Sequence, residues 1–282
     1  IFEILLMSAF LIMDASDLIL QDKNPSYYHK AGSFPISSFI APLFSNLSVD
    51  SLIFIERFCW WFHIVGILAF LNYLAISKHL HILLAFPSTY YSKLNPKGQF
   101  SNMESVTKEV KIMLDPNADP FSQPVESNPV RFGAKDVKDL NWLQLLNSYS
   151  CTECGRCTSE CPANFTGKKL SPRKIMMDVR DRLEEVGRGI DKNGANFNDK
   201  KALLGDYIKP EELWACTSCN ACVEACPINI DPLSIIMDLR RYAVMEESSA
   251  PSELNSVFSN IENNGAPWPF PSAERLKWKD DE

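Results

Sequence analysis

The sequence predicts an all-α protein in which transmembrane helices precede a helical, cysteine-rich soluble domain. Two apolar runs, residues 1–20 and 51–86, are each long enough to cross the ~30 Å hydrocarbon core of a bilayer. Residues 136–247 contain helix start signals around two cysteine runs and no alternating strand pattern. We therefore assign residues 1–98 to a transmembrane part and residues 136–247 to a soluble helical domain.

Eight of the nine cysteines fall in two runs with one spacing, Cys-x2-Cys-x2-Cys-x3-Cys-Pro. In bacterial ferredoxins such a run binds one [4Fe–4S] cluster through its first three thiolates, and its fourth cysteine ligates the other cluster. The spacing therefore predicts two ligand sets, each drawn from both runs. The sets are Cys151, Cys154, Cys157 and Cys226 for cluster 1, and Cys216, Cys219, Cys222 and Cys161 for cluster 2.

Two other chemistries use closely spaced cysteines. Zinc sites pair two Cys-x2-Cys units across a longer loop, and disulfide frameworks are typical of small secreted domains. Four cysteines within eleven residues, found twice and each time closed by Cys-Pro, fit both patterns poorly. The ninth cysteine, Cys59, lies in the second apolar run and is expected to be a small buried side chain.

The soluble domain contains an internal duplication. Ser171-Pro172 and Asp231-Pro232 each place an N-cap side chain before a proline at the first helical position. Both predicted helices then read Pro-x-x-Ile-x-Met-Asp-x-Arg. The cysteine runs are 65 residues apart and these helices 60 residues apart, which indicates a duplication with an insertion.

The remaining segments are predicted to be a linker and a tail. Four prolines interrupt residues 99–135. Residues 248–282 mix prolines with aromatic residues, and they are expected to be either flexible or a docking segment for a partner. The whole net charge of −7 falls in residues 99–282, so we expect no nucleic-acid partner. The cysteine-rich domain has no histidine, and no catalytic residue is predicted there.

His63 and His81 are predicted to bind haem b. In one continuous helix over residues 51–86, their separation of 18 residues is five whole turns. Both side chains would then leave the same helix face, about 27 Å apart along the axis. An intramembrane histidine is a functional site by default, and this spacing suits a two-haem electron path. His79 points elsewhere and is the weaker candidate, and the alternative for His81 is a position at the water interface.

The second apolar run resembles the last helix of the nitrate reductase gamma-subunit family of cytochrome b. The resemblance is carried by Glu56-Arg57-Phe58, by His63 and by the Ser77-Lys78-His79-Leu80-His81 segment. It implies haem ligation by His63 and His81 together with partner histidines on an earlier helix. That earlier helix is not in the sequence, which begins with Ile1, so we expect either a preceding N-terminal part or no bound haem.

Residues 136–247 resemble the α-helical dicluster ferredoxin module found in the C subunit of heterodisulfide reductase, and the related modules of glycerol-3-phosphate and glycolate dehydrogenases. The resemblance rests on the complete eight-cysteine pattern. With its membrane part, the chain resembles a membrane-bound heterodisulfide reductase-like iron–sulfur protein. This implies an electron-transfer subunit that passes electrons, in either direction, between a soluble-side partner and the quinone pool. The implied partners are a cysteine-rich protein of the Cys-Cys-Gly type, a flavoprotein or another dehydrogenase, together with membrane lipid and quinone.

The basic residues around the second apolar run predict an orientation. Lys78, Lys93 and Lys97 follow this run, whereas Lys23 and Lys30 precede it. By the positive-inside rule, the cluster domain is expected on the cytoplasmic side of a prokaryotic inner membrane. Two other interpretations remain: a membrane-anchored dicluster ferredoxin without haem, and a membrane scaffold in which the clusters only hold the fold.

Overall fold

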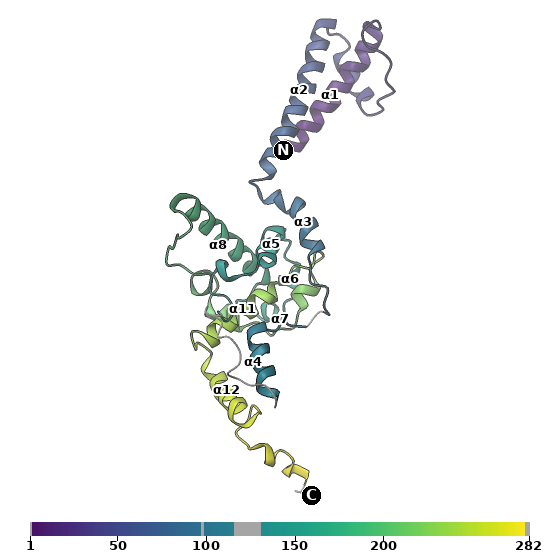
Figure 1. Ribbon diagram of the computed structural model, residues 1–282. Coiled ribbons are helices and arrows are strands. Elements are labelled where there is room, and N and C mark those ends of the chain that lie inside the picture. Colours follow the sequence, from purple (N-terminus) through teal and green to yellow (C-terminus); the bar gives the residue numbers. More distant parts are fainter. Residues whose placement is uncertain (1, 97–98, 116–130, 280–282) are drawn as a thin grey trace. The chain divides into compact units, whose positions relative to one another are not determined.

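The computed structural model describes residues 2–96, 99–115 and 131–279 (Figure 1). Helices are the regular structure of this part of the chain, which contains no strand, as the sequence predicts. The residues form two compact units, 1–80 and 81–282. Part of the predicted linker, residues 116–130, lies outside the described residues.

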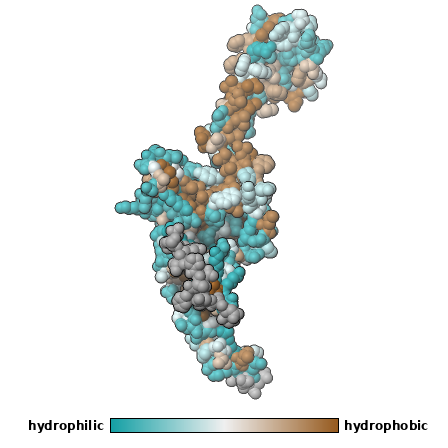
Figure 2. Space-filling model, in the orientation of Figure 1, coloured by the Kyte–Doolittle hydropathy of each residue, from teal (hydrophilic) through white to brown (hydrophobic). Residues whose placement is uncertain are grey.

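The first unit is a helical hairpin. Helix α1 (Phe2–Lys23) and helix α2 (Val49–Leu74) pack along each other, and residues 24–48 connect them through the short 3-10 helices η1 (Ser37–Phe39) and η2 (Ala41–Phe44). Ser48 begins α2 as its N-cap, because its side chain accepts a hydrogen bond from the Ser51 amide. In Figure 2 the half of this hairpin that contains the start of α1 and the end of α2 shows an apolar surface.

Among the described residues, α2 is the one helix that is long and apolar enough to cross a membrane. Its large apolar side chains stay exposed within the hairpin, for example Phe54, Leu68 and Leu71. Water does not solvate such a surface well, whereas lipid does. The span predicted over residues 1–20 coincides with α1 but remains a prediction, because α1 is not among the helices that meet this test.

The prediction of one helix over residues 51–86 is wrong. Helix α2 ends at Leu74, a turn follows, and the 3-10 helix η3 (Lys78–Leu80) leads into helix α3 (His81–Tyr90). Ser77 accounts for the break: its hydroxyl lies 3.3 Å from the Leu74 carbonyl oxygen, to which it donates, and 3.2 Å from the His79 amide, from which it accepts. Serine side chains compete in this way with the helical backbone bonds.

This break removes the helical argument that paired His63 with His81. His63 lies in α2, whereas His81 begins α3 in the second unit, so the two side chains do not share one helix face. Pro87, expected to close the run, lies inside α3. Helix α3 packs on helix α5 (Trp142–Ser150), where the Ser88 hydroxyl donates to Asn147 over 2.9 Å. The packing of α3 on α5 explains why the unit boundary lies at residue 80, before the predicted end of the membrane part at residue 98.

The second unit holds the cysteine-rich domain and the segments around it. Its long helices are α4 (Glu104–Leu114), α8 (Pro172–Asn193), α11 (Pro232–Met245) and α12 (Ser252–Asn264). Its short ones are η4 (Val137–Asp139), α6 (Arg156–Ser159), α7 (Pro162–Phe165), η5 (Leu203–Tyr207), α9 (Pro210–Trp214), α10 (Ala221–Glu224), η6 (Ser272–Glu274) and η7 (Lys277–Lys279). The predicted tail thus contains one regular helix, α12.

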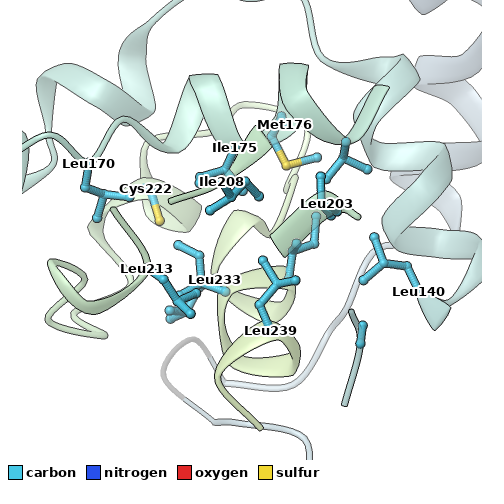
Figure 3. Packing of buried hydrophobic residues seen from close by; sticks show 14 of the residues in the cluster. Leu140, Leu170, Ile175, Met176, Leu203, Ile208, Leu213, Cys222, Leu233 and Leu239 are labelled. Atoms are coloured by element: carbon cyan, nitrogen blue, oxygen red, sulfur yellow. The ribbon is translucent and has the colours of Figure 1, made fainter. Parts of the chain in front are cut away.

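The two duplicated helices, α8 and α11, pack together at the centre of the core (Figure 3). Ile175 and Ile235 occupy the same position in the two repeats, and both side chains are 0% exposed. Their N-caps also correspond, since Ser171 accepts from the Lys174 amide and Asp231 from the Ser234 amide. The sequence repeat is therefore a structural repeat.

Candidate metal-cluster site

Both cysteine runs bend through left-handed residues at equivalent positions. Glu153 and Ser218, each directly before the second cysteine of its run, have φ values of 58° and 57°. Gly155 and Asn220, each directly after that cysteine, have φ values of 83° and 63°. Glycine and asparagine adopt this conformation at low cost, whereas most residues do not. The alternation bends each run tightly, and in the first run the three leading cysteines line one pocket.

The first loop also receives a cysteine from the second run. Cys151, Cys154, Cys157 and Cys226 line one pocket, together with Cys222. Cys226 follows α10, which packs on α6, the helix that contains Cys157 of the first run. The fold thus brings together the four residues predicted for cluster 1, although ligation itself remains a prediction.

The pKa shifts of the thiols also indicate which cysteines lie close together. Burial, together with the nearby Cys151, Cys154 and Cys226 thiols, raises the pKa of Cys157 to about 11. Burial also raises the pKa of Cys216, where Cys161 and Cys219 act in the same direction. Thiols of the two runs therefore lie near each other, with Cys226 near Cys157 and Cys161 near Cys216; the ligand sets themselves remain predictions.

Cys222 is the link between the two sets. Burial and its neighbours raise its pKa to about 12; these neighbours are Asp231, Cys216 and Cys161 of its own predicted set, and Cys157 of the other. Several adjacent thiolates in an apolar site repel one another and lose hydration. A positively charged metal group would stabilise them, and its binding would displace the thiol protons.

Two arginines, at the last position of the repeated pattern, hold the two loops. Arg180 of α8 forms a 2.5 Å ion pair with Glu153 in the first loop. Arg240 of α11 donates to the Cys216 carbonyl over 2.6 Å and approaches the Ser218 hydroxyl at 3.4 Å. Each arginine thus contacts the residue with positive φ before the second cysteine of its loop, Glu153 or Ser218. The sequence showed the repeated arginine, but reasoning from the sequence assigned it no function.

Backbone amides approach the sulfur atoms in the second run. The Ser218 amide lies 3.4 Å from Cys216 Sγ, and the Ile230 amide lies 3.4 Å from Cys226 Sγ. Such N–H donors stabilise the negative charge of a ligating thiolate and are among the factors that set a cluster's potential. One donor belongs to the bent loop and the other follows Cys226 by four residues.

The cysteines fit neither a disulfide framework nor a single-metal site. All nine cysteines are free thiols. Within the described ranges, no three His, Cys, Asp or Glu side chains gather closely enough to hold a single metal ion. Thiolates spaced around a shared pocket suit a four-iron cube, in which each corner takes one cysteine. The residues present therefore fit two [4Fe–4S] clusters.

His63, one of the two predicted haem ligands, packs against helix α1. Its Nδ1 atom lies 3.0 Å from the carbonyl oxygen of Leu6 on α1, and its ring is 5.6 Å from that of Phe10. A ligating histidine usually donates its other ring N–H to such an acceptor. His79 packs near Phe70 instead, with ring centroids 6.3 Å apart.

Residues 150–230 match the family model of the 4Fe-4S dicluster domain. These residues form a dicluster domain. The match covers both cysteine runs and the helix between them. Domains of this family bind iron–sulfur clusters, which carry electrons.

The chain is similar to several longer proteins. A probable iron-sulfur-binding oxidoreductase, FadF, of Bacillus subtilis is 33% identical over 98% of this chain and 40% of its own length. An EtfAB:quinone oxidoreductase of Syntrophomonas wolfei is 28% identical over 100% of this chain and 39% of its own. A probable membrane-anchored ferredoxin of Chromohalobacter salexigens is 32% identical over 53% of this chain and 24% of its own.

These proteins show that the homologues are iron–sulfur oxidoreductases and ferredoxins, and they also include C subunits of heterodisulfide reductases. The chain spans about two fifths of the length of the first two relatives. No solved structure matches the chain. The cytochrome b resemblance of the membrane part has no counterpart in these names.

Proposed function

We propose that the chain is the electron-transfer part of a membrane-bound, quinone-linked oxidoreductase. The observation that carries this proposal is the pocket that Cys226 shares with the first cysteine run and that Cys222 of the second run also lines. When bound, two [4Fe–4S] clusters supply one-electron carriers. The eight cysteines would hold them as two cross-linked sets, and the fold would keep the sets adjacent for electrons to pass between them.

The protein's own residues would control the surroundings of the clusters. Met176 and Ile230 line the cluster 1 pocket with apolar surface and exclude water from one side of it. Arg180 and Arg240 keep the loops in their bent form, and the amides at Ser218 and Ile230 stabilise thiolate charge. The chain would position and tune the carriers, while the metal groups accept and release electrons.

The proposed partners follow from the names of the relatives. The name of the Syntrophomonas wolfei protein pairs EtfAB with quinone, and we extend this pairing to a flavoprotein partner and a quinone for this chain. Heterodisulfide reductase subunits work with other subunits, which supports a Cys-Cys-Gly-type partner or module.

We place the dicluster domain at the cytoplasmic side of a prokaryotic inner membrane, on the basis of Lys78, Lys93 and Lys97.

The first test follows the clusters during turnover. The full chain in its membrane should contain about eight iron and eight sulfide per chain. Addition of a reduced electron-transferring flavoprotein should produce the EPR signals of reduced [4Fe–4S] clusters, and a menaquinone analogue should remove them. Clusters that stay in one redox state while quinone is reduced would instead support the structural scaffold.

A haem b at His63 is the second part of the proposal. The 3.0 Å contact between His63 Nδ1 and the Leu6 carbonyl orients the ring and would leave Nε2 available for iron. His63→Ala should therefore abolish the sharp α band of b-type haem in a dithionite-reduced difference spectrum. The matched control is His29→Ala, which removes an exposed histidine from the loop between α1 and α2.

The same spectra test the haem-free alternative. If the native chain in its membrane shows no b-type band, the membrane-anchored dicluster ferredoxin without haem is the better description. His81→Ala tests the second predicted ligand, which has lost its support from helix geometry because it begins α3. An unchanged band in that variant would remove His81 from the ligand set.

A further inference from the structure

The two halves of the duplication have opposite charges. Residues 150–173, from the first cysteine run to the start of α8, contain four basic and two acidic residues. The equivalent residues 215–233 contain two acidic residues and no basic one. The first half therefore has a net charge of +2 and the second of −2, within a chain of net charge −7. The two cysteine-containing segments therefore differ in the charge of their own residues.

Two of the basic residues lie at the cluster 1 pocket. Arg156 and Arg173 line it beside the cysteines, and both are exposed. The Thr158 hydroxyl lies 2.9 Å from the Ser171 hydroxyl and 3.3 Å from the Arg173 amide, so the starts of α6 and α8 are fixed against each other. We call Arg156 and Arg173 the basic rim.

The basic rim is not neutralised by the acidic residues nearby. Neither arginine forms an ion pair within the part of the chain that the structure describes. Glu153 of the same loop is paired with Arg180 at 2.5 Å. Glu160 lies at the opposite end of α6 and is exposed. The charge of the rim is therefore available to an external group.

The pocket inside the rim is mainly apolar and reaches the surface. Pro227, Ile228 and Ile230 form part of its lining, and Cys154 is exposed at its edge. Phe165, on α7, is 86% exposed. Apolar surface surrounded by charged groups is typical of interfaces between proteins that meet transiently, because the charges steer the approach and the apolar part is buried on contact.

The second cysteine run has a different environment. Lys93, Phe100 and Ser101 of the preceding segment line a pocket together with Asn220 and Met237, so the chain itself packs near this loop. The Ser101 carbonyl also accepts a hydrogen bond from Arg241 of α11. The second run is thus partly covered by its own chain, including the cations Lys93 and Arg241, whereas the first run is open at the basic rim.

We infer that a soluble one-electron redox protein with a carboxylate-rich face docks on the basic rim and exchanges electrons with cluster 1 past Cys154. With cluster 1 bound, each exchange would move one electron between the partner's carrier and cluster 1 in either direction, and no bond would break or form and no proton would be transferred. Cluster 2 is then the inner carrier of the pair. This inference rests on the proposed function and adds which of the two clusters exchanges electrons with the soluble partner.

The test uses the full chain with both clusters and reverses the charge of the rim. Reduced clusters are oxidised in a stopped-flow instrument by anthraquinone-2,6-disulfonate, an anion, or by hexaammineruthenium(III), a cation. The double variant Arg156→Glu/Arg173→Glu should slow oxidation by the anion roughly tenfold and accelerate oxidation by the cation. Both effects should shrink as salt is added, since salt screens exposed charges.

The matched control makes the same change of charge elsewhere. Lys192→Glu/Lys200→Glu alters two exposed lysines, and Lys192 lies about 28 Å along α8 from Arg173. This variant should oxidise at native rates with both reagents. Equal responses of the two double variants would overturn the inference. The visible absorbance of the clusters shows, for each variant, that the fold and the clusters are intact.

An acidic peptide tests the carboxylate-rich face directly. Oligoglutamate should slow oxidation of the native chain by the anthraquinone reagent, and it should have little effect on the rim variant. Oligolysine of the same length should slow neither. If oligoglutamate has no effect on the native chain while flavoprotein-to-quinone transfer proceeds, the docking site is wrong and the proposed function stands. Clusters that never change redox state would refute the proposed function instead.

Discussion

Cys226→Ser should remove the cluster held by the first cysteine run and leave the cluster of its own run in place. The reason is the fold, which puts Cys226 in one pocket with Cys151, Cys154 and Cys157. A four-iron cube that lacks one thiolate has an iron corner open to water and is lost or degraded. Iron content should fall to about half, and flavoprotein-to-quinone electron transfer should fall to background.

The comparison that decides this prediction is between pairs of variants. Cys226→Ser and Cys157→Ser should keep the same residual cluster, with the same EPR g values. Cys161→Ser and Cys222→Ser should share the other one. If each run instead holds its own cluster, Cys226→Ser will match Cys222→Ser. Cys59→Ala, the cysteine of α2 that belongs to neither run, is the control and should retain both clusters.

The sequence was sufficient to predict the dicluster domain because its chemistry is local. Cysteine spacing determines which thiols fit around one loop, and Ser-Pro or Asp-Pro marks a helix start through the N-cap and the fixed φ of proline. The structure has both helix starts, at Pro172 and Pro232, and an all-helical domain around them. These features need no knowledge of distant contacts.

The break after α2 was missed because apolar composition alone does not distinguish one long helix from two. Ser77 terminates the helix through its side-chain hydrogen bonds, and α3 is held by its packing on α5, about sixty residues further along the chain. Similarly, the anchoring of the loops by Arg180 and Arg240 depends on where two helices lie relative to two loops. Such tertiary contacts override local patterns and leave little trace in a single sequence.

Arg182→Met should cause the largest loss of stability among single changes outside the cysteines. Arg182 lies on α8 with a side chain 3% exposed, between Asp136 at 2.8 Å and Asp199 at 2.6 Å. It also donates to the Lys201 carbonyl over 2.7 Å. The guanidinium thus joins the start of the domain and the loop after α8 to this helix. Methionine would fill much of the volume but leave two carboxylates without their counterion.

The pKa of Asp199 indicates how strongly this site favours the ion pair. Hydrogen bonds from Arg182 lower that pKa to about 2, below its ordinary value of 3.8. The stabilisation of the folded state by this ion pair is fully present at a pH above the ordinary pKa of 3.8, and it is lost as the pH falls through about 2. A comparison of the native chain with the Arg182→Met variant at neutral pH therefore measures the whole stabilisation that this ion pair provides. In the Arg182→Met variant, the pKa of Asp199 should return toward its ordinary value.

Breaking a buried ion pair by removing one partner typically costs about 3–5 kcal/mol. For a domain of this size, that should lower the apparent Tm by on the order of 10 °C, measured by far-ultraviolet circular dichroism on the full chain with its clusters. The control is Arg188→Met on the same helix, where an exposed pair with Glu184 contributes about 0.5 kcal/mol or less. If the two variants melt together, Arg182 does not hold the segments around α8, and the core formed by α8 and α11 must supply that stability alone.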